Sequence, residues 1–456
     1  MQDLTTGSVT RHLLKTSSFM LVTMLFQTMY FLVDLYWVGR LGKEAIAAVG
    51  VAGNLTFIVL ALSQMLGVGT TTVVSHASGR KDRDGAILLF NQSQVLSMVA
   101  GVVFLVVMMT LRRAYTSALA ADAVTEQLAA DYLLWFIPAM SLQFAMVAMG
   151  SALRGTGNFK PGMIVQTATV ILNMLLAPVL IFGWLTGYPM GVAGAAISTL
   201  VAVAVGVIWL SWHFISDAQF LHFRWPDWRP RFGTWASMLK IGLPAGAEFA
   251  LTAVYLFIVY TVCRPFGASA QAAFGIGLRL VQSMFLPVVA LAFAAGPVAG
   301  QNVGAGKADR VRSAFQSAVG MAAGATIVSA LIGYFAAERL MAIFSADPVV
   351  VRVGVDYLHI AAWSFVASGV VFVSSSMFQA LGNTIPPLIT SVSRITLIAV
   401  PVIVLARQPG FKLTTIWYLS VAGTVLQMIV NLALLRREYT IRFPPAAGRN
   451  QPSLSA

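Results

Sequence analysis

The first long apolar stretch of the chain, residues 13–37, reads LLKTSSFMLVTMLFQTMYFLVDLYW. About 20 apolar residues in a helix cross the hydrocarbon core of a bilayer, so this stretch predicts a transmembrane helix. Eleven further stretches have the same character, which predicts an all-α integral membrane protein. The twelve predicted transmembrane helices lie near residues 13–37, 46–70, 86–111, 130–153, 162–183, 190–215, 238–263, 270–298, 312–336, 354–381, 385–406 and 414–435.

The composition excludes a soluble protein and explains the basic charge. The chain is 58% hydrophobic and 10% charged, whereas soluble domains carry roughly 25% charged residues. Of 29 Lys and Arg residues, 18 fall on the side of the two termini, nine on the other side and two within spans. The positive-inside rule therefore predicts that both termini are cytoplasmic. The net charge of +13 follows mostly from topology, and we expect no nucleic-acid partner.

The sequence repeats itself at an offset of 225 to 227 residues. LGKEAIAAVG (41–50) recurs as FGASAQAAFG (266–275), GRKD (79–82) as GKAD (306–309), and GNFKP (157–161) as GNTIP (382–386). Each half holds six predicted spans, so the halves insert with the same orientation, related by a pseudo-two-fold axis along the membrane normal. We expect an N-terminal lobe at 1–215, a cytoplasmic linker at 216–237, a C-terminal lobe at 238–436, and a disordered cytoplasmic tail at 437–456.

Two acids, Asp34 and Glu248, are the only ones among sixteen that lie deep inside apolar stretches. A carboxylate in hydrocarbon costs several kcal/mol unless it is protonated or paired. Gln27, Tyr30 and Asp34 share one face of the first helix, which should face protein or a water-filled cavity. We expect Asp34 to take up and release a proton, with Tyr30 and Asn173 rearranging around it. The alternative is a structural acid that holds helices together through hydrogen bonds.

The second acid, Glu248, follows a proline and small residues that break the start of the seventh helix. It is a candidate second acidic site for a cationic substrate or a proton. Alternatively, it pairs with Arg279 or Arg394, the two basic residues that lie within apolar stretches.

Other side chains suggest an adaptable cavity and exclude several classes of site. Met24 and Met65 are candidates, with Tyr30, to line a substrate cavity, because methionine is flexible and polarisable. Packing against lipid or protein is the alternative for each methionine. Five histidines lack metal-ligand spacing and there is a single cysteine, so we expect no metal and no cofactor. A degenerate GAGK segment (304–307) lacks the serine or threonine of a phosphate loop, which argues against ATP hydrolysis.

Several motifs resemble those of multidrug and toxic compound extrusion (MATE) transporters, and the DinF-like branch fits best. They are VDLYWVGRLG (33–42) with AIAAVG (45–50), QMLGVG (64–69), ALRGTG (152–157) and MGVAGAA (190–196). The resemblance implies two lobes around a central cavity, and export of organic cations or other amphipathic compounds against H⁺ or Na⁺. It also implies that Asp34 is the coupling carboxylate, with Gln27, Tyr30, Asn173 and Thr199 as its polar partners.

The chain departs from the family pattern at positions that bear on the coupling ion. Ala177 stands where DinF-like relatives carry an aspartate, which argues against a sodium site built wholly by the protein in the N-terminal lobe. The NorM-like branch has acids at positions that correspond here to Thr252 and, approximately, Ser368. Glu248 lies one turn before Thr252 and is a possible substitute. Phe19 replaces a proline that DinF-like relatives often have, so bending of the first helix is not expected.

These observations together predict a multi-pass secondary antiporter of a bacterial inner membrane. It would export amphipathic or cationic compounds in exchange for protons, with Na⁺ as the less favoured coupling ion. We expect a monomer without an obligate protein partner. A related lipid-linked saccharide flippase is the alternative, although such a protein would carry more cavity arginines. An integral-membrane enzyme is a third reading, which lacks a cluster of catalytic polar residues.

Overall fold

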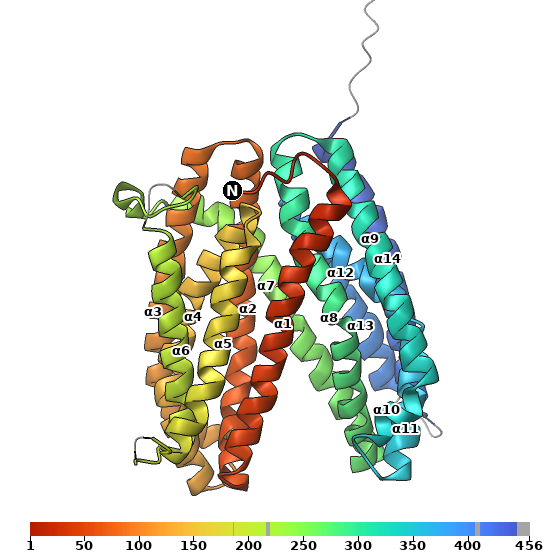
Figure 1. The fold of residues 1–456 in the computed structure, drawn as a ribbon. Helices are drawn as coiled ribbons and strands as arrows, with labels where there is room; N and C mark the ends of the chain where they lie inside the picture. The colour runs from red at the N-terminus through yellow and green to blue at the C-terminus, as the bar shows by residue number, and fades with distance from the viewer. Residues whose placement is uncertain (186, 216–218, 406–410, 445–456) are drawn as a thin grey trace, which may run out of the picture.

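The computed structural model describes residues 1–185, 187–215, 219–405 and 411–444, and all regular structure within them is helical (Figure 1). The first half contains α1 (Val9–Gly39), α2 (Lys43–Gly79), α3 (Arg83–Leu119), α4 (Ala123–Gly155), α5 (Phe159–Phe182) and α6 (Gly191–His213). A short 3₁₀ helix, η1 (Trp225–Trp228), follows in the linker. The second half contains α7 (Phe232–Cys263), η2 (Arg264–Phe266), α8 (Ala268–Gly304), α9 (Ala308–Phe335), α10 (Ala337–Ala342), α11 (Pro348–Ala362), α12 (Phe365–Leu381), α13 (Ile385–Leu405) and α14 (Leu413–Arg442).

The predicted all-α membrane fold is confirmed. In the described part of the chain, eleven helices are long and apolar enough to cross a membrane, and α11 with α12 forms a twelfth, bent span. This tenth span was expected as one helix over 354–381, but its two pieces meet at 57°. The Ser364 hydroxyl donates to the Ala361 carbonyl at 2.8 Å. The backbone N–H groups of Trp363 and Ser364 also bond three residues back, to Ile360 and Ala361, so α11 ends in a tighter turn before α12 begins.

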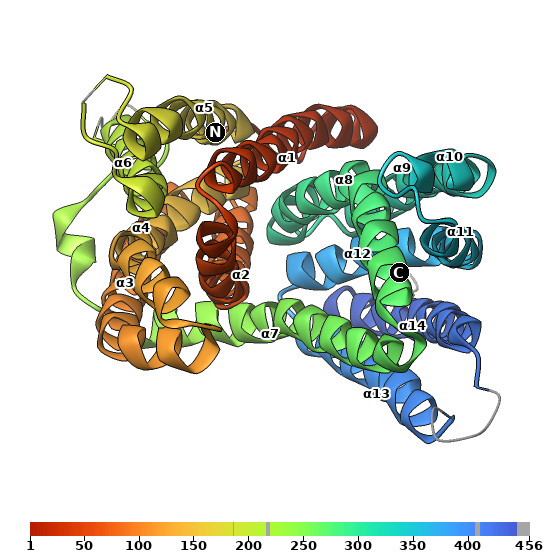
Figure 2. The ribbon, with the colours of Figure 1, turned by 90° about the horizontal axis from the view of Figure 1, so that it is seen from below.

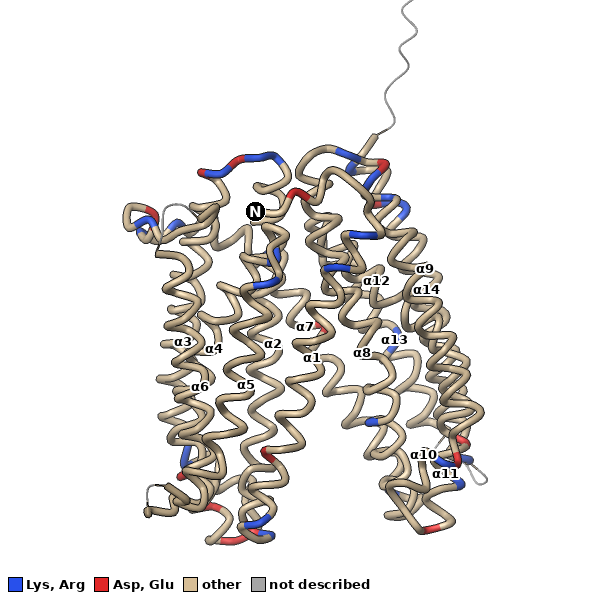
Figure 3. The backbone as a smooth tube through the Cα atoms, in the orientation of Figure 1, with Lys and Arg blue, Asp and Glu red and all other residues tan. Residues whose placement is uncertain are grey.

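The helices form two bundles that meet at one end and diverge toward the other (Figures 1 and 2). Helices α1 and α7 connect the bundles: α1 packs on α5 and α8, and α7 packs on α2 and α13. Residue 1 and the end of α14 lie at the end where the bundles meet, and many Lys and Arg residues gather there (Figure 3). Helix α14 runs into the expected tail as far as Arg442; residues 216–218 of the expected linker and 445–456 of the expected tail lie outside the described residues.

The internal repeat is visible in the backbone at a constant offset. Helices α2 and α8 have 37 residues each, and their bounds differ by 225 positions. Gly157 and Gly382, also 225 apart, both take the left-handed conformation, with φ of 76° and 81°. Lys81 (φ 59°) corresponds in the same way to Gly306 (φ 69°). The sequence match of GRKD (79–82) with GKAD (306–309) has an offset of 227, so it is two residues out of register with the backbone repeat.

The bundles touch along a seam that we define by Gly69, His76 and Gly79 of α2 on one side and Met238 of α7 with Gln301 and Gly304 of α8 on the other. A Cβ atom on Gly79 would collide with the carbonyl oxygen of Gln301, and one on Gly304 would collide with that of His76. Only glycine allows backbones to approach this closely. His76 Nε2 lies 2.7 Å from the Ala380 carbonyl, and Gln301 Nε2 donates to the Gly155 carbonyl at 3.0 Å. Glycine contacts and cross-bundle hydrogen bonds thus hold this end closed.

Candidate functional site

Asp34 lies on α1 one turn after Tyr30, which belongs to a polar cluster formed by α1, α5 and α6. The Thr199 hydroxyl is the centre of the cluster: Asn173 Nδ2 donates to it at 3.0 Å, and the Tyr30 hydroxyl lies 3.3 Å from it. Thr199 in turn donates to the Ala195 carbonyl one helical turn away. The structure therefore brings Tyr30, Asn173 and Thr199 into one hydrogen-bonded group. These are three of the four residues expected from the sequence as polar partners of Asp34.

Two oxygen atoms at this site lack a hydrogen-bond donor. Within the described residues, Asp34 Oδ1 and Asn173 Oδ1 are both enclosed by protein and accept no hydrogen bond. A buried acceptor without a donor costs about 1–3 kcal/mol, and more when it carries a charge. A proton on Asp34, or a cation held beside either oxygen, would supply a missing partner. Gln27, by contrast, is exposed on α1 and joins no hydrogen bond among the described residues.

Ala177 lies one turn beyond Asn173 and is packed in the apolar core of the first bundle. A methyl group there leaves Asp34 as the one carboxylate that the sequence offers to this cluster. Ala177 packs against apolar side chains and contributes no side-chain hydrogen bond to the cluster.

The second acid, Glu248 on α7, lies in a separate polar cluster of the second bundle. Its Oε1 accepts hydrogen bonds from the hydroxyls of Ser375 at 3.0 Å and Ser391 at 3.3 Å. Gln427 Nε2 donates to Ser391 at 3.0 Å and extends the cluster to α14. The sequence reading missed these three partners; the triple serine at 374–376 inside an apolar helix is the signal that could have found Ser375.

The two basic residues considered as partners of Glu248 form no ion pair with it in the described part of the chain. Arg279 is exposed on α8. Arg394 places its guanidinium 5.5 Å from the centre of the Tyr255 ring, a cation–π geometry. Its Nε is enclosed and has no hydrogen-bond partner. Among the described residues hydroxyl donors bond Glu248 directly, and Arg394 interacts with it electrostatically at longer range than a salt bridge.

The candidate cavity methionines lie in different surroundings. Met24 is half-buried on α1. Met65 is half-buried where α2 crosses α7, and its carbonyl oxygen lies so close to Gly242 that no Cβ would fit between them. A small cavity of about 30 Å³ lies near this level between the bundles, with Gln64, Thr71 and Arg154 on one side and Phe293 and Gln379 on the other. The lining roles of Met24 and Met65 remain predictions.

Comparison with known proteins assigns the family. The MatE family model matches residues 20–179 and 244–405, one match in each half. The multidrug export protein MepA of Staphylococcus haemolyticus is 26% identical over 437 residues, which covers 94% of this chain and 95% of MepA. The FAD transporter of Shewanella oneidensis is 25% identical and covers 81% of this chain and 82% of its own.

Solved structures show the same fold. An outward-facing multidrug resistance MATE transporter superposes with a TM-score of 0.89 at 23% identity, over 96% of this chain and 98% of its own. A MOP superfamily transporter from Pyrococcus furiosus gives a TM-score of 0.89 at 22% identity, with the same coverage. Together with the family model, which covers more than half of the sequence, these matches lead to one assignment: the chain belongs to the MATE family, whose members are transporters rather than enzymes.

Proposed function

We propose that the protein exports amphipathic, cationic organic compounds across the bacterial cytoplasmic membrane in exchange for protons, with Asp34 as the coupling carboxylate. The observation that carries the proposal is the pair of enclosed, unmatched acceptors, Asp34 Oδ1 and Asn173 Oδ1. The printed names of the relatives, among them a multidrug export protein, support the substrate class.

A proton on Asp34 changes the hydrogen-bonding balance of the cluster. The protonated carboxyl becomes a donor and can satisfy one of the acceptors around it. When Asp34 is ionised, the same site holds an uncompensated negative charge in a poorly solvated place, which attracts an organic cation. Proton and cation therefore compete for one carboxylate, and this competition is the physical basis of exchange.

The single carboxylate favours H⁺ over Na⁺ as the coupling ion. A sodium ion requires several oxygen ligands, and Ala177 withholds the second carboxylate that DinF-like relatives place near Asn173. A proton requires only one acceptor, and Asp34 Oδ1 is an acceptor that no donor of the described residues satisfies. We assign the chain to the DinF-like branch on the same ground, the position of its acid in the first lobe.

Orientation follows from the charged residues. If the end that is rich in Lys and Arg is cytoplasmic, both termini are cytoplasmic and the bundles are closed on that side (Figure 3). The bundles then diverge toward the outside, which corresponds to an outward-facing state. In the opposite state the seam of α2 with α7 and α8 would have to open, because it spans both bundles.

The proposal is tested by ethidium export from proteoliposomes under separately imposed H⁺ and Na⁺ gradients. We expect export driven by the pH gradient, lost in Asp34→Asn and retained in Asp356→Asn, a matched change of an exposed acid on α11. Export that follows Na⁺ and survives Asp34→Asn would move coupling to Glu248. Absence of export under either gradient would favour the flippase alternative.

A further inference from the structure

Four consecutive polar residues, Asn91 to Gln94, are almost fully buried in α3, with exposed fractions of 0–2%. The first two hold the linker in place. The Asn91 side-chain oxygen accepts from Trp228 Nε1 at 2.8 Å and from the Arg224 backbone at 3.1 Å. Gln92 donates to the carbonyl of Arg229 at 2.8 Å. These bonds fix η1 against the side of the first bundle.

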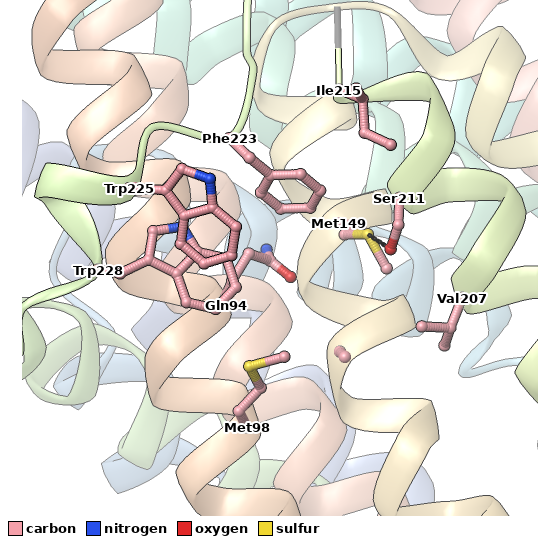
Figure 4. Close-up of a pocket in the computed structure, with 10 residues that line it drawn as sticks. Gln94, Met98, Met149, Val207, Ser211, Ile215, Phe223, Trp225 and Trp228 are labelled. Carbon is pink, nitrogen blue, oxygen red and sulfur yellow. Dashed lines mark hydrogen bonds between the residues drawn. The ribbon is translucent and has the colours of Figure 1, made fainter.

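The fixed linker roofs a cavity of about 420 Å³ between α3, α4 and α6 (Figure 4). A cavity of this size matches small-molecule sites, which range from about 300 to 1,000 Å³. Its roof consists of aromatic rings and its walls are apolar. The roof residues are Phe223, Trp225 and Trp228, and the wall residues include Met98, Met149 and Val207. All lining residues come from the first bundle and the linker, so the cavity is separate from the seam and from Glu248.

Gln94 is the member of the polar quartet whose oxygen has no partner. Its Nε2 donates to the Ser93 hydroxyl at 3.2 Å, while among the described residues its Oε1 accepts no hydrogen bond. Figure 4 shows this amide among the side chains that surround the cavity, beside the Trp rings. The Ser211 hydroxyl also lines the cavity, 3.8 Å from the Met149 sulfur. The cavity thus combines an aromatic roof, soft sulfur atoms and the free acceptor oxygen of Gln94.

We propose that this cavity is a second binding site, which takes an uncharged aromatic amphiphile that carries a hydrogen-bond donor. The aromatic body would stack under Trp225 and Trp228, and its N–H or O–H would reach Gln94 Oε1. The charges near the linker favour an uncharged ligand over a cation. Arg224, Arg229 and Arg231 outnumber Asp84 and Asp227, the two acids that pair with Arg224 and Arg231.

Entry from the bilayer follows from the exposed side chains at the cavity. Met98 is 49% exposed and Ile215 is 68% exposed, and both line it. In a membrane protein such apolar surface faces lipid, and paired Trp rings are typical of the level where lipid meets water. A compound dissolved in the leaflet would reach the site laterally. This site therefore differs in ligand charge and in access from the one at Asp34.

The test is direct binding of N-phenyl-1-naphthylamine, an uncharged aromatic amine with one N–H, to the full-length protein in lipid nanodiscs. Its fluorescence increases in apolar sites, and empty nanodiscs give the lipid background. We expect saturable binding that Gln94→Leu weakens roughly fivefold through loss of one hydrogen bond. The N-methylated probe, which has no donor, should bind the wild type as weakly as the parent probe binds Gln94→Leu.

A cavity-filling pair of variants completes the test. Val207→Trp should abolish saturable binding, whereas Val106→Trp, on an α3 residue that is 60% exposed and does not line the cavity, should leave it unchanged. Equal binding of both probes by the wild type would overturn the role of Gln94, and this comparison needs no variant to fold. Saturable binding that survives Val207→Trp, or tighter binding of ethidium than of the neutral amine, would overturn the proposal. Because binding is measured without a gradient, the result is independent of the coupling ion.

Discussion

His76 and Gln301 are equivalent residues of the two halves, 225 positions apart, and each bonds to a carbonyl of the opposite bundle at equivalent positions. His76 Nε2 lies 2.7 Å from the Ala380 oxygen, and Gln301 Nε2 lies 3.0 Å from the Gly155 oxygen, again 225 positions apart. Gln301 Oε1 also accepts from the Leu4 backbone at 2.9 Å. The pseudo-two-fold axis is thus expressed in a matched pair of hydrogen bonds that closes one end of the molecule.

Replacement of Gln301 by leucine should loosen that end. The change leaves the Leu4 N–H and the Gly155 oxygen without partners, at a cost of about 1–3 kcal/mol for each buried group. Thiol labelling of Ser75→Cys reports the opening, because Ser75 is buried against Gly300 at the seam. We expect faster labelling in the Gln301→Leu background and no change with Gln127→Leu, an exposed glutamine. Equal labelling rates in the two backgrounds would show that Gln301 does not hold the seam.

Substitution of Gly79 by alanine should separate α2 from α8, because the added Cβ collides with the Gln301 carbonyl. Gly53 on the same helix is the matched control, since a Cβ there meets no atom within 4 Å. Overpacking at such contacts typically costs 1–3 kcal/mol, so we expect about that loss for Gly79→Ala. Gly53→Ala should be neutral or stabilise by up to about 1 kcal/mol. Thermal unfolding in detergent measures both, and equal melting temperatures would refute the close crossing.

A third prediction concerns backbone strain at Lys81, a non-glycine residue with φ of 59°. The left-handed conformation costs residues other than glycine roughly 1–2 kcal/mol. Lys81→Gly should therefore raise stability by about 1 kcal/mol, and Gly306→Ala at the equivalent turn should lower it by a similar amount. Denaturation of the two variants checks this. Changes of the same sign in both would contradict the equivalence of the turns.

The Thr199 hydroxyl should be required for proton-coupled export. Thr199→Val keeps the shape but leaves Asn173 Nδ2 without its acceptor and removes the partner of the Tyr30 hydroxyl, a loss of about 1–3 kcal/mol in this cluster. We expect export to fall and its pH dependence to shift, while Thr199→Ser retains both. If Thr199→Val lowers only the amount of folded protein, with an unchanged pH profile, the hydroxyl serves stability alone.

The sequence predicted the features that depend on hydropathy and local spacing. Twelve spans, the repeat and the isolation of Asp34 follow from the positions of apolar and charged residues. The partners of Glu248 could not be predicted, because Ser375, Ser391 and Gln427 lie 127 to 179 positions further along the chain and only packing brings them together. The bend at Ser364 was missed for a different reason: it lies within a continuous apolar stretch that has no proline to mark it.

The role expected for Gln27 stays a prediction. Its spacing places it on the face of Tyr30 and Asp34, but α1 is a long helix that leaves the first bundle to reach α8, and Gln27 is exposed there. The aromatic roof of the cavity at Gln94 could not be predicted from local spacing either. It forms because the linker folds back onto α3 and bonds to Asn91 and Gln92.

The central claim, that a proton and an organic cation compete for Asp34, is tested most directly by proton release on binding. Tetraphenylphosphonium is added to purified protein in a weakly buffered solution that contains a pH-sensitive dye, with and without Na⁺. The account predicts release of up to one proton for each cation bound, independent of Na⁺, and no release from Asp34→Asn. Binding to the wild type without proton release, or equal release from Asp34→Asn, would contradict it.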